Sequence, residues 1–319
     1  MITLLIDNGS QQFQPAVAGK ITWSLERQGA PGKLTFTVYQ DRTLSFTEGS
    51  LVCLFVNQKA VFYGFVFERV PKKEGTTSVV AYDQLRYLKN KDTYVYENKT
   101  ATEVIQMIAA DFNLSVGTLE DTGFKIEARS EQDKTLFDII LTALGLTTIS
   151  TGQMYTLYDD YGKLTLKNMA NMKLDILINA VTAQDYDYTS SIDGETYNQV
   201  KVSIDNEETG KRDVYIAKHT ENINAWGVLQ HFYKADSKET NGQVVADQLL
   251  EKYNRKTKKL SVKNAFGDIQ VRAGCLIPVM LDLGDMKLNN YMLVEKAEHT
   301  FEGSLHTMDL TLRGGGFSA

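Results

Sequence analysis

The end of the segment from Gly267 to Leu312 constrains the fold most strongly, because the apolar and polar residues of its last hairpin, from Leu293 to Leu312, alternate with a period of two. Successive side chains of a strand point to opposite faces of a sheet, so this period predicts strands with one buried face. A two-residue turn at Glu302 and Gly303 would join two of these strands into a hairpin in which Phe301 faces Ser304. The buried face is then made of Leu293, Ala297, His299, His306, Met308, Leu310 and Leu312, and the exposed face of Lys296, Glu298, Thr300, Thr307, Asp309 and Thr311.

The N-terminal part of the chain has the same β character. Apolar and polar residues alternate at Ile21–Leu25 and Leu34–Val38, and continuous apolar runs follow at Leu51–Val56 and Val61–Val70. Alternation is typical of half-buried strands, and short continuous runs are typical of more deeply buried ones. The polar residues Asn57–Lys59 predict a tight turn between the two runs. We therefore expect a small β-barrel or sandwich in this part of the chain.

Helices are predicted in the middle of the chain. Thr100 and Glu103 have the spacing of a capping box, in which each residue's side chain accepts a hydrogen bond from the other's backbone N–H. The apolar residues that follow have helical spacing: Val104, Ile105, Ile108, Ala109 and Phe112. A second amphipathic pattern predicts a helix over Lys134–Leu144 that stops at Gly145.

Strands and a further helix are predicted after this region. A hairpin is expected from Met154–Tyr158 and Lys163–Leu166, and strands are expected at Asn198–Asp205 and Asp213–Ala217. A segment without a clear period follows. A helix is then predicted over Asn241–Lys256, where cations in the last turn suit the helix dipole. Its inward side chains are predicted to be Val244, Val245, Leu249 and Tyr253.

Two distant segments share a short frame. TEGSLVCLFV contains Gly49 and RAGCLIPVML contains Gly274, and each glycine stands two residues before an apolar run. Chance and a repeated β-barrel both explain so short a frame. If the barrel is repeated, three copies of the chain carry six similar barrels, which match a six-fold tube.

The predicted fold is a β-rich α+β protein with two small tube-like β-barrel domains and a helical or mixed domain between and inserted. With 319 residues, the chain is longer than a single hydrophobic core requires. The expected domains are a first barrel at 1–90, a mixed α/β domain with two short helices and a hairpin at 91–175, and a second barrel at 176–319 with a helical insertion at about 218–258.

Composition and charge argue against several classes of protein. The net charge is −6 and basic residues are dispersed, which disfavours a surface that wraps nucleic acid. The N-terminus has no basic segment and reaches Asp7 early, so no signal peptide is expected. No apolar run approaches the ~18 residues of a membrane span. Cys53 and Cys275 lie in apolar runs and are predicted to be free core thiols, in a product assembled in the cytoplasm.

Segments spread along most of the chain match one known family, and they occur in that family's order. They are Ala81–Ile105, Tyr197–Val202, Gly267–Ile269, Arg272–Gly274, Tyr291–Glu295, and His299 with His306, Thr307, Met308 and Leu310. On these segments the chain resembles the baseplate hub proteins of PBSX-like prophages, the XkdQ/YqbQ family. Each segment alone is a weak signal, and their combination is fairly specific.

This resemblance implies a homotrimeric hub related in fold to the late control protein of contractile phages and to the hub half of VgrG spikes. Such a hub forms a collar that adapts the six-fold tail tube to the three-fold central spike, in the baseplate of a phage tail or an R-type bacteriocin particle. The implied partners are further copies of the chain, the tail tube protein, the central spike protein, LysM-type and other baseplate proteins, and the tape-measure protein as a further candidate. The resemblance supplies no catalytic residues to carry over. Together with the composition, it leads us to expect no enzyme, no catalytic, cofactor-binding or metal-binding residues, no specific nucleic-acid binding and no membrane insertion.

The histidines were the first candidates for chemistry. The 4 histidines show no HExxH or other short ligand spacing. In the predicted hairpin His299 faces His306, and one metal ion could be reached by both. Two imidazoles leave a tetrahedral site incomplete, with Glu302 or Glu295 as possible supplements. Packing or hydrogen bonding is therefore the favoured role for this pair.

Other polar clusters also have structural explanations. Paired carboxylates occur in predicted turns, where solvated loop charges are favoured over a glycosidase pair: Asp159 with Asp160, Glu207 with Glu208, and Asp282 with Asp285. A basic cluster could bind an acidic partner or simply end a helix: Lys252, Arg255, Lys256, Lys258 and Lys259. Two short stretches are rich in tyrosine, which is enriched at protein interfaces but also fits the alternation of a strand: Tyr94 with Tyr96, and Tyr186 with Tyr188. The glycines at 314–316 follow the last strand and read as a flexible tail.

Two other functions remain as alternatives to the hub. A tail-associated cell-wall hydrolase would carry a catalytic domain of separate composition, and it would clear a zymogram of Gram-positive walls. A receptor-binding or carbohydrate-binding tail protein would expose aromatic pairs and bind cell surfaces. A hub would instead copurify with tube and spike.

Overall fold

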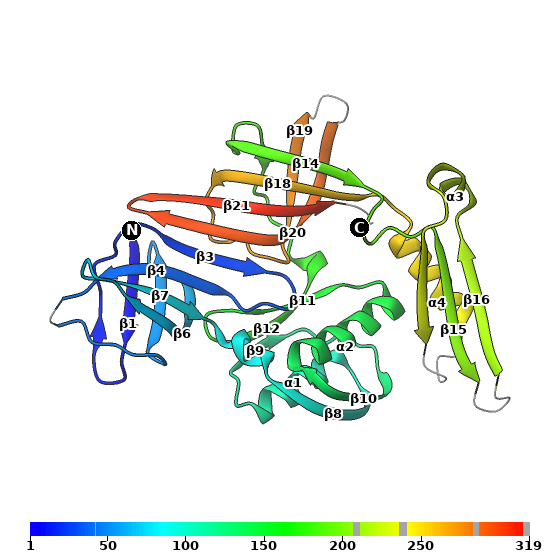
Figure 1. The fold of residues 1–319 in the computed structure, drawn as a ribbon, viewed down its shortest axis with the longest axis horizontal. Helices are drawn as coiled ribbons and strands as arrows, with labels where there is room; N and C mark the ends of the chain where they lie inside the picture. Colours follow the sequence, from blue (N-terminus) through cyan, green and yellow to red (C-terminus); the bar gives the residue numbers. More distant parts are fainter. Residues whose placement is uncertain (42, 207–210, 236–240, 283–286, 315–319) are drawn as a thin grey trace. The chain divides into compact units, whose positions relative to one another are not determined.

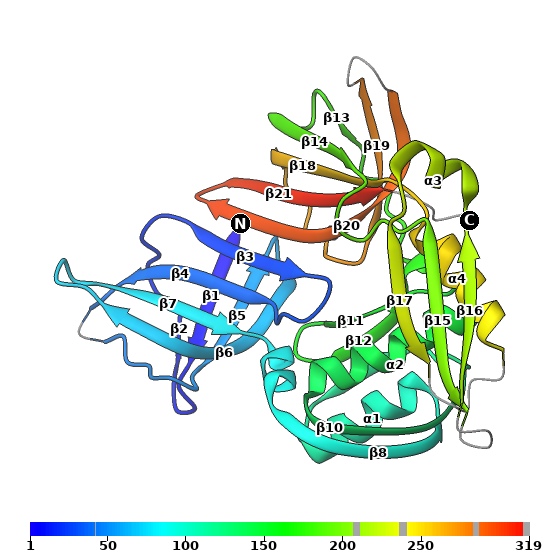
Figure 2. The same cartoon turned by 45° about the vertical axis from the view of Figure 1, so that its right-hand side comes forward.

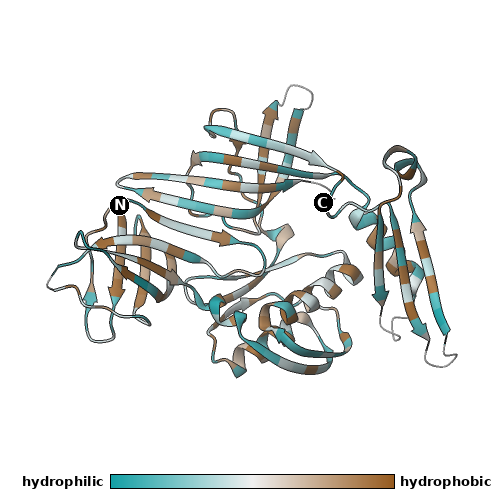
Figure 3. Cartoon of the chain, in the orientation of Figure 1, coloured by the Kyte–Doolittle hydropathy of each residue, from teal (hydrophilic) through white to brown (hydrophobic). Residues whose placement is uncertain are grey.

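The structure, a computed structural model, describes all residues except 42, 207–210, 236–240, 283–286 and 315–319 (Figure 1). The chain is divided into two compact units. The first unit consists of Met1–Tyr186 and Ser261–Leu312, and the second consists of Asp187–Leu260 and the described residues after Leu312. Apolar and polar bands alternate along the long strands, as the sequence predicts (Figure 3).

The N-terminal strands form one antiparallel arrangement, which we call the N-terminal set. Its strands are β1 (Ile2–Asp7), β2 (Gln12–Phe13), β3 (Ile21–Glu26), β4 (Lys33–Tyr39), β5 (Leu51–Val56), β6 (Lys59–Pro71) and β7 (Thr76–Tyr82). Hydrogen bonds link them in the order β3-β4-β7-β6-β5-β1-β2. The strands predicted in this region are confirmed as β3, β4, β5 and β6. Asn57 and Gln58 join β5 to β6 with φ angles of 50° and 65°, as a type I′ turn requires.

A second group of strands, the C-terminal set, has a matching order. Its strands are β13 (Ile178–Asn179), β14 (Asp185–Ser191), β18 (Thr257–Phe266), β19 (Leu276–Asp282), β20 (Lys287–Glu302) and β21 (Leu305–Gly314). Hydrogen bonds link them in the order β14-β18-β21-β20-β19-β13. This order matches β3-β4-β7-β6-β5-β1 of the N-terminal set, strand for strand along the chain. One pairing differs, since β13 runs parallel to β19 whereas β1 runs antiparallel to β5.

The two sets repeat the same backbone geometry where β5 and β19 begin. Gly49 and Gly274 both have a positive φ, of +85° and +98°. The N–H of Gly49 donates to the carbonyl of Val66 at 2.8 Å, and the N–H of Gly274 donates to the carbonyl of Val294 at 2.8 Å. The short frame shared by the two segments in the sequence therefore corresponds to equivalent positions in the two sets.

Strand β20 joins the two sets into a single sheet. It pairs antiparallel with β3, with Phe301 opposite Ile21, His299 opposite Trp23 and Lys296 opposite Glu26. Phe301 also belongs to the hydrophobic core of the N-terminal set. The C-terminal set therefore completes the core of the N-terminal set.

The β20–β21 hairpin shows that the predicted turn was wrong by one residue. Glu302 ends β20, and Gly303, with a φ of 58°, forms the turn with Ser304. His306 consequently stacks on Phe301 instead of facing His299, with ring centroids 4.3 Å apart, and this aromatic packing fixes the register. The two predicted faces are confirmed, because the side chains predicted to be inward are buried apart from the half-buried His306.

A mixed α/β region lies between the two sets in the sequence. Its elements are η1 (Gln84–Lys89), β8 (Lys91–Lys99), α1 (Ala101–Asp111), β9 (Val116–Leu119), β10 (Ile126–Thr135), α2 (Leu136–Thr151), β11 (Tyr155–Asp159), β12 (Leu164–Asn168) and η2 (Met169–Asn171). The capping box of Thr100 and Glu103 is confirmed at the start of α1. The predicted hairpin is confirmed as β11 and β12.

Helix α2 is longer than predicted. Gly145 does not end it, and the helix continues to Thr151 with Gly152 in the left-handed conformation at φ 71°. Glycine inside a helix costs about 1 kcal/mol relative to alanine. Burial of Ile140, Ala143 and Thr147 on one face outweighs that cost.

The second unit contains a separate three-stranded sheet. Its elements are β15 (Gln199–Asn206), β16 (Lys211–Lys218), α3 (Thr220–Trp226), β17 (Gln230–Ala235) and α4 (Gly242–Tyr253). The sheet order is β16-β15-β17, and α4 packs along one face (Figure 2). The strands predicted at 198–205 and 213–217 exist, but they lie in this sheet and not in the C-terminal set. The predicted inward face of α4 was partly wrong, because Val244 is 46% exposed and Ala246 is buried in its place.

Candidate functional site

The turn between β11 and β12 is tight and contacts the N-terminal set. Tyr161 has a φ of 49° and Gly162 has a φ of 81°, so the chain folds back tightly and the N–H of Gly162 donates to Oδ1 of Asp159 at 2.7 Å. The ring of Tyr161 packs against Phe55 of β5 and Tyr63 of β6, at centroid distances of 5.7 and 5.5 Å. The turn therefore docks on the N-terminal set.

Two carboxylates are buried beside this turn. Asp83 caps η1 and accepts hydrogen bonds from the N–H groups of Gly32 at 2.9 Å and Leu85 at 3.1 Å. Asp159 accepts a further bond from Nε2 of Gln84 at 3.0 Å. Burial away from water raises the pKa of Asp159 to about 6, and burial with the nearby charge of Asp159 raises the pKa of Asp83 well above its ordinary value.

The prediction that Asp159 is a solvated loop charge was therefore wrong. Its side chain is 6% exposed, whereas the side chain of Asp160 is 65% exposed. The reason is the tight turn, which directs Asp159 back toward Gln84 on a segment distant in sequence.

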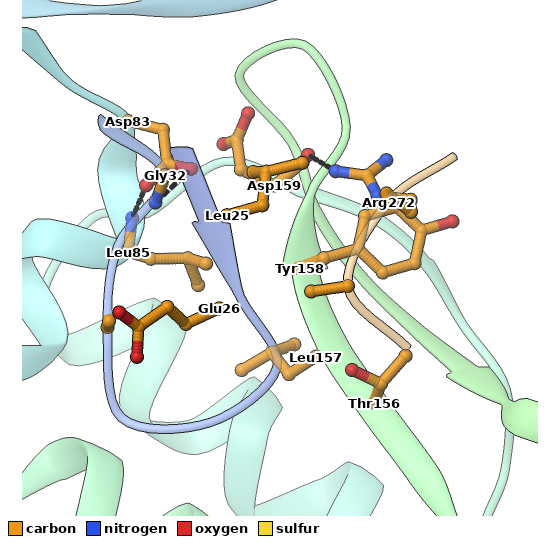
Figure 4. A pocket seen from close by; sticks show the side chains of 12 residues that line it. Leu25, Glu26, Gly32, Asp83, Leu85, Thr156, Leu157, Tyr158, Asp159 and Arg272 are labelled. Atoms are coloured by element: carbon orange, nitrogen blue, oxygen red, sulfur yellow. Dashed lines mark hydrogen bonds between the residues drawn. The ribbon is translucent and has the colours of Figure 1, made fainter. Parts of the chain in front are cut away.

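Arg272 ties the same turn to the C-terminal set. Its Nη2 donates to the backbone carbonyl of Asp159 at 2.8 Å, and its guanidinium lies 3.8 Å from the centre of the Tyr158 ring (Figure 4). Gly274 approaches Thr156 of β11 so closely that an added Cβ would lie 2.7 Å from the Thr156 methyl group. The hairpin β11–β12 thus contacts both strand sets, and we call this region the junction.

The junction has no room for a substrate. The cavity between Asp83, Thr156, Tyr158 and Arg272 measures about 10 Å³, which is roughly the space of one water. Within the described part of the chain, no three His, Cys, Asp or Glu side chains gather to hold a metal ion. The chemistry of the junction is therefore proton binding and hydrogen bonding between structural elements.

His299 lies in the β3–β20 pairing, and His306 lies beside it on β21. Nδ1 of His299 is 2.9 Å from Nε2 of His306, and Nε2 of His299 is 2.8 Å from the carbonyl of Val271. A carbonyl only accepts, so Nε2 of His299 carries its proton and Nδ1 accepts from His306. His299 also stacks on Trp23 at 5.0 Å. The predicted packing and hydrogen-bonding role is confirmed, and both ring nitrogens of His299 are engaged in it.

The remaining candidates are placed as follows. Tyr94 and Tyr96 are buried beneath α1 and α2, while Tyr186 and Tyr188 are half-buried. Cys53 and Cys275 are free and buried, as predicted. In the basic cluster, Lys252, Lys256 and Lys259 are exposed and Arg255 and Lys258 are half-buried. Asp282 is exposed, and the predicted candidates at 207, 208, 285, 315 and 316 lie outside the described residues.

Sequence reasoning missed Asp83, Gln84 and Arg272. A signal existed for Asp83, because an aspartate before the helical pattern of residues 84–89 is a typical N-cap. Gln84 and Arg272 gave no local signal, since their partner Asp159 is remote in the sequence. No described helix is both long and apolar enough to cross a membrane.

Replacement of Arg272 tests the junction. We expect Arg272→Ala to lower the free energy of unfolding by about 2–4 kcal/mol, from a charged hydrogen bond and a cation–π contact. Urea unfolding at pH 7 measures this change. Arg212→Ala is the matched control, because Arg212 forms an exposed ion pair with Asp205 and should change stability much less. Equal losses in the two variants would contradict the assigned role of Arg272.

Comparisons with known proteins agree with this geometry. The prophage MuSo2 43 kDa tail protein of Shewanella oneidensis superposes with a TM-score of 0.72 at 14% identity, over 97% of this chain and 98% of that chain. An E. coli protein, described as a type VI secretion component with structural similarity to the T4 tail proteins gp27 and gp5, gives a TM-score of 0.61 at 10% identity, over 98% of this chain and 77% of that chain. The chain therefore has the fold of phage tail proteins.

Its family is shown by sequence. The YQBQ-like family model matches residues 21–313. The phage-like element PBSX protein XkdQ of Bacillus subtilis is 31% identical over 319 residues, covering 97% of this chain and 96% of the relative. The chain belongs to the YQBQ-like family.

Proposed function

We propose that the chain is a structural baseplate hub of a contractile tail-like particle. In this proposal it forms a homotrimeric collar that adapts the six-fold tail tube to the three-fold central spike. The supporting observation is the repeated strand order of the two sets, with Gly49 and Gly274 at equivalent positions. A trimer of a chain with two equivalent sets presents six similar units, which match a six-fold partner.

In this hub the two sets act as tube-like barrel domains. The first barrel corresponds to residues 1–90, the mixed region at 91–175 braces it, and the second barrel corresponds to 176–319. The helical insertion in the second barrel is at about 218–258, within the compact unit that contains residues 187–260. The junction of Asp159 and Arg272 supports this arrangement, because it fixes both sets to one rigid hairpin.

The proposed partners follow from the collar. They are two further copies of the chain, the tail tube protein, the central spike protein, and LysM-type or other baseplate proteins. Assembly takes place in the cytoplasm before the hub enters the particle. No catalytic role is part of this proposal. The hydrolase and receptor-binding alternatives have no comparable structural support.

Labelling of the particle tests the hub role. The chain is expressed with a small tag at its C-terminus in the host of its particle, and the particles are imaged by electron microscopy with a gold-labelled tag ligand. We expect label at the junction of tube and spike, and deletion of the gene should abolish particles with a complete baseplate. Label along the tube or on peripheral fibres, or intact baseplates after deletion, would contradict the proposal. A zymogram of Gram-positive walls distinguishes the hydrolase.

Trimer formation is a separate expected result. We expect the purified chain, mixed with its spike protein, to sediment with three copies of the chain per complex. Sedimentation velocity with both proteins at micromolar concentration measures this ratio. The chain without spike is the control, since a hub that needs its spike to trimerise will sediment as a smaller species. A complex that contains a single copy of the chain at every concentration would exclude the collar.

A further inference from the structure

The sheet of the second unit has one covered face and one open face. Val200, Val202 and Ile204 of β15 are buried on the face that packs against α4. Strand residues alternate between faces, so Lys201, Ser203 and Asp205 lie on the opposite face together with their register partners on β16 and β17. We call this second surface the open face.

The open face carries apolar side chains on its two outer strands. Val214 and Ile216 of β16 and Phe232 of β17 are 46%, 50% and 54% exposed. The register places Lys201 between Ile216 and Phe232, so the apolar side chains flank one lysine. Scattered exposed apolar residues are ordinary, but these three gather on one small face, on the two strands that flank β15.

The open face as a whole is basic. Its charged side chains are Lys201, Arg212, Lys218, Lys234 and Asp205, which give a net charge of +3 in a chain whose net charge is −6. Asp205 is bonded to Arg212 at 2.9 Å and to Lys234 at 2.7 Å, so its charge is neutralised locally. The face therefore attracts an acidic surface and repels a second open face.

The area of a single open face limits how tightly it can bind a partner. Three strands about 4.8 Å apart and about seven residues long present roughly 300 Å². A stable interface uses about 800 Å² per partner. One open face is thus too small for a durable dimer, whereas three copies held in one collar can bind through multivalency.

We propose that the open face binds an acidic protein surface that also exposes apolar side chains, carried by a different protein of the same particle. The inference rests on the proposed hub function, because the collar supplies the multivalency. Single-stranded nucleic acid fits less well, since it requires several stacking aromatic side chains, and among the described residues of this face Phe232 is the aromatic one.

Photo-crosslinking in the assembled particle tests the proposal. Phe232 is replaced by the photo-crosslinking amino acid p-benzoylphenylalanine, and purified particles are irradiated and analysed by mass spectrometry. Val244, which is 46% exposed on α4, takes the same replacement as a position control. We expect a cross-link from position 232, and not from 244, to an acidic segment of another particle protein.

A charge reversal in the same particles completes the test. The Lys201→Glu/Lys218→Glu variant should reduce the cross-linked product by about tenfold or more, because like charges across an interface are strongly unfavourable. The Lys256→Glu/Lys259→Glu variant makes the same charge change outside the open face, and it should leave the amount of cross-linked product unchanged. A cross-link to another copy of this chain, to a basic segment or to nucleic acid, equal product from both variants, or no cross-link would overturn the proposal. The location of the labelled hub is read independently, so these outcomes do not decide the hub function.

Discussion

Gly274→Ala is expected to destabilise the chain far more than Gly49→Ala, although the two glycines occupy equivalent positions. Both have a positive φ, of +98° and +85°, which costs a residue with a Cβ about 1–2 kcal/mol. An added Cβ at Gly49 meets no atom within 4 Å, whereas at Gly274 it would meet Thr156 at 2.7 Å. Overpacking adds about 1–3 kcal/mol, so Gly274→Ala should lower the free energy of unfolding by about 2–5 kcal/mol. Urea unfolding of the two variants measures the difference.

A double-mutant cycle assigns the extra loss to its cause. Thr156→Ala removes the methyl and hydroxyl groups nearest to the new Cβ, so Gly274→Ala should be at least about 1 kcal/mol less damaging in that background. Gly49→Ala should be unaffected by the same background. If the two glycine variants lose equal stability in the wild-type background, the close approach of Gly274 to Thr156 is not what distinguishes them.

Acidification is expected to weaken the β3–β20 pairing through His299. Burial lowers the pKa of His299 from 6.5 to about 3, and the neighbouring His306 contributes to the same shift. The unfolded chain binds this proton at a higher pH than the folded chain, so stability is complete above about pH 6.5 and is lost as the pH falls toward 3. Each pH unit within this window corresponds to about 1.4 kcal/mol, so His299 should remove about 2 kcal/mol between pH 7 and pH 5.

The comparison with His299→Gln isolates this effect. Asp83 and Asp159 have raised pKa values, so their contribution has the opposite sign and is lost as the pH rises from the ordinary carboxyl range toward the raised pKa, which is about 6 for Asp159. The stability difference between wild type and His299→Gln should therefore shrink by about 2 kcal/mol from pH 7 to pH 5, while the carboxylate contribution cancels. Trp23 fluorescence reports the pairing directly in a Trp226→Phe background, where it is the remaining tryptophan of the chain's 2. A difference that is constant with pH would mean that His299 is not buried in its neutral form.

Local pattern predicted the strands well because burial and register act over a few residues. The run Leu51–Val56 was predicted with the bounds of β5, because a short continuous apolar run is typical of a strand that is buried along its whole length. Strand β17 was not predicted, because its inward positions are His231, Tyr233 and Ala235, which conceal the period. The mixed polarity of these residues suits an edge strand beside α4 but gives no clear alternation in the sequence.

The junction could not be predicted, because its contacts join remote segments. Asp159 stands before Asp160, Tyr161 and Gly162, and a run with aspartate and glycine is typical of a solvated turn. Its burial depends on Gln84, which lies 75 residues away in the sequence, and on Arg272, which lies 113 residues away. The left-handed conformation of Tyr161 has no sequence signal either, since non-glycine residues rarely adopt it.

The β3–β20 pairing has a mechanical consequence. Its register joins six pairs of residues, from Phe301 opposite Ile21 to Lys296 opposite Glu26. Interstrand hydrogen bonds lie perpendicular to the strands, so a force directed along β3 shears the whole ladder at once and is shared among its bonds. A force across the strands would instead open the ladder from one end, bond by bond. Resistance to being pulled apart should therefore depend on direction, with the axis of β3 and β20 as the strong one.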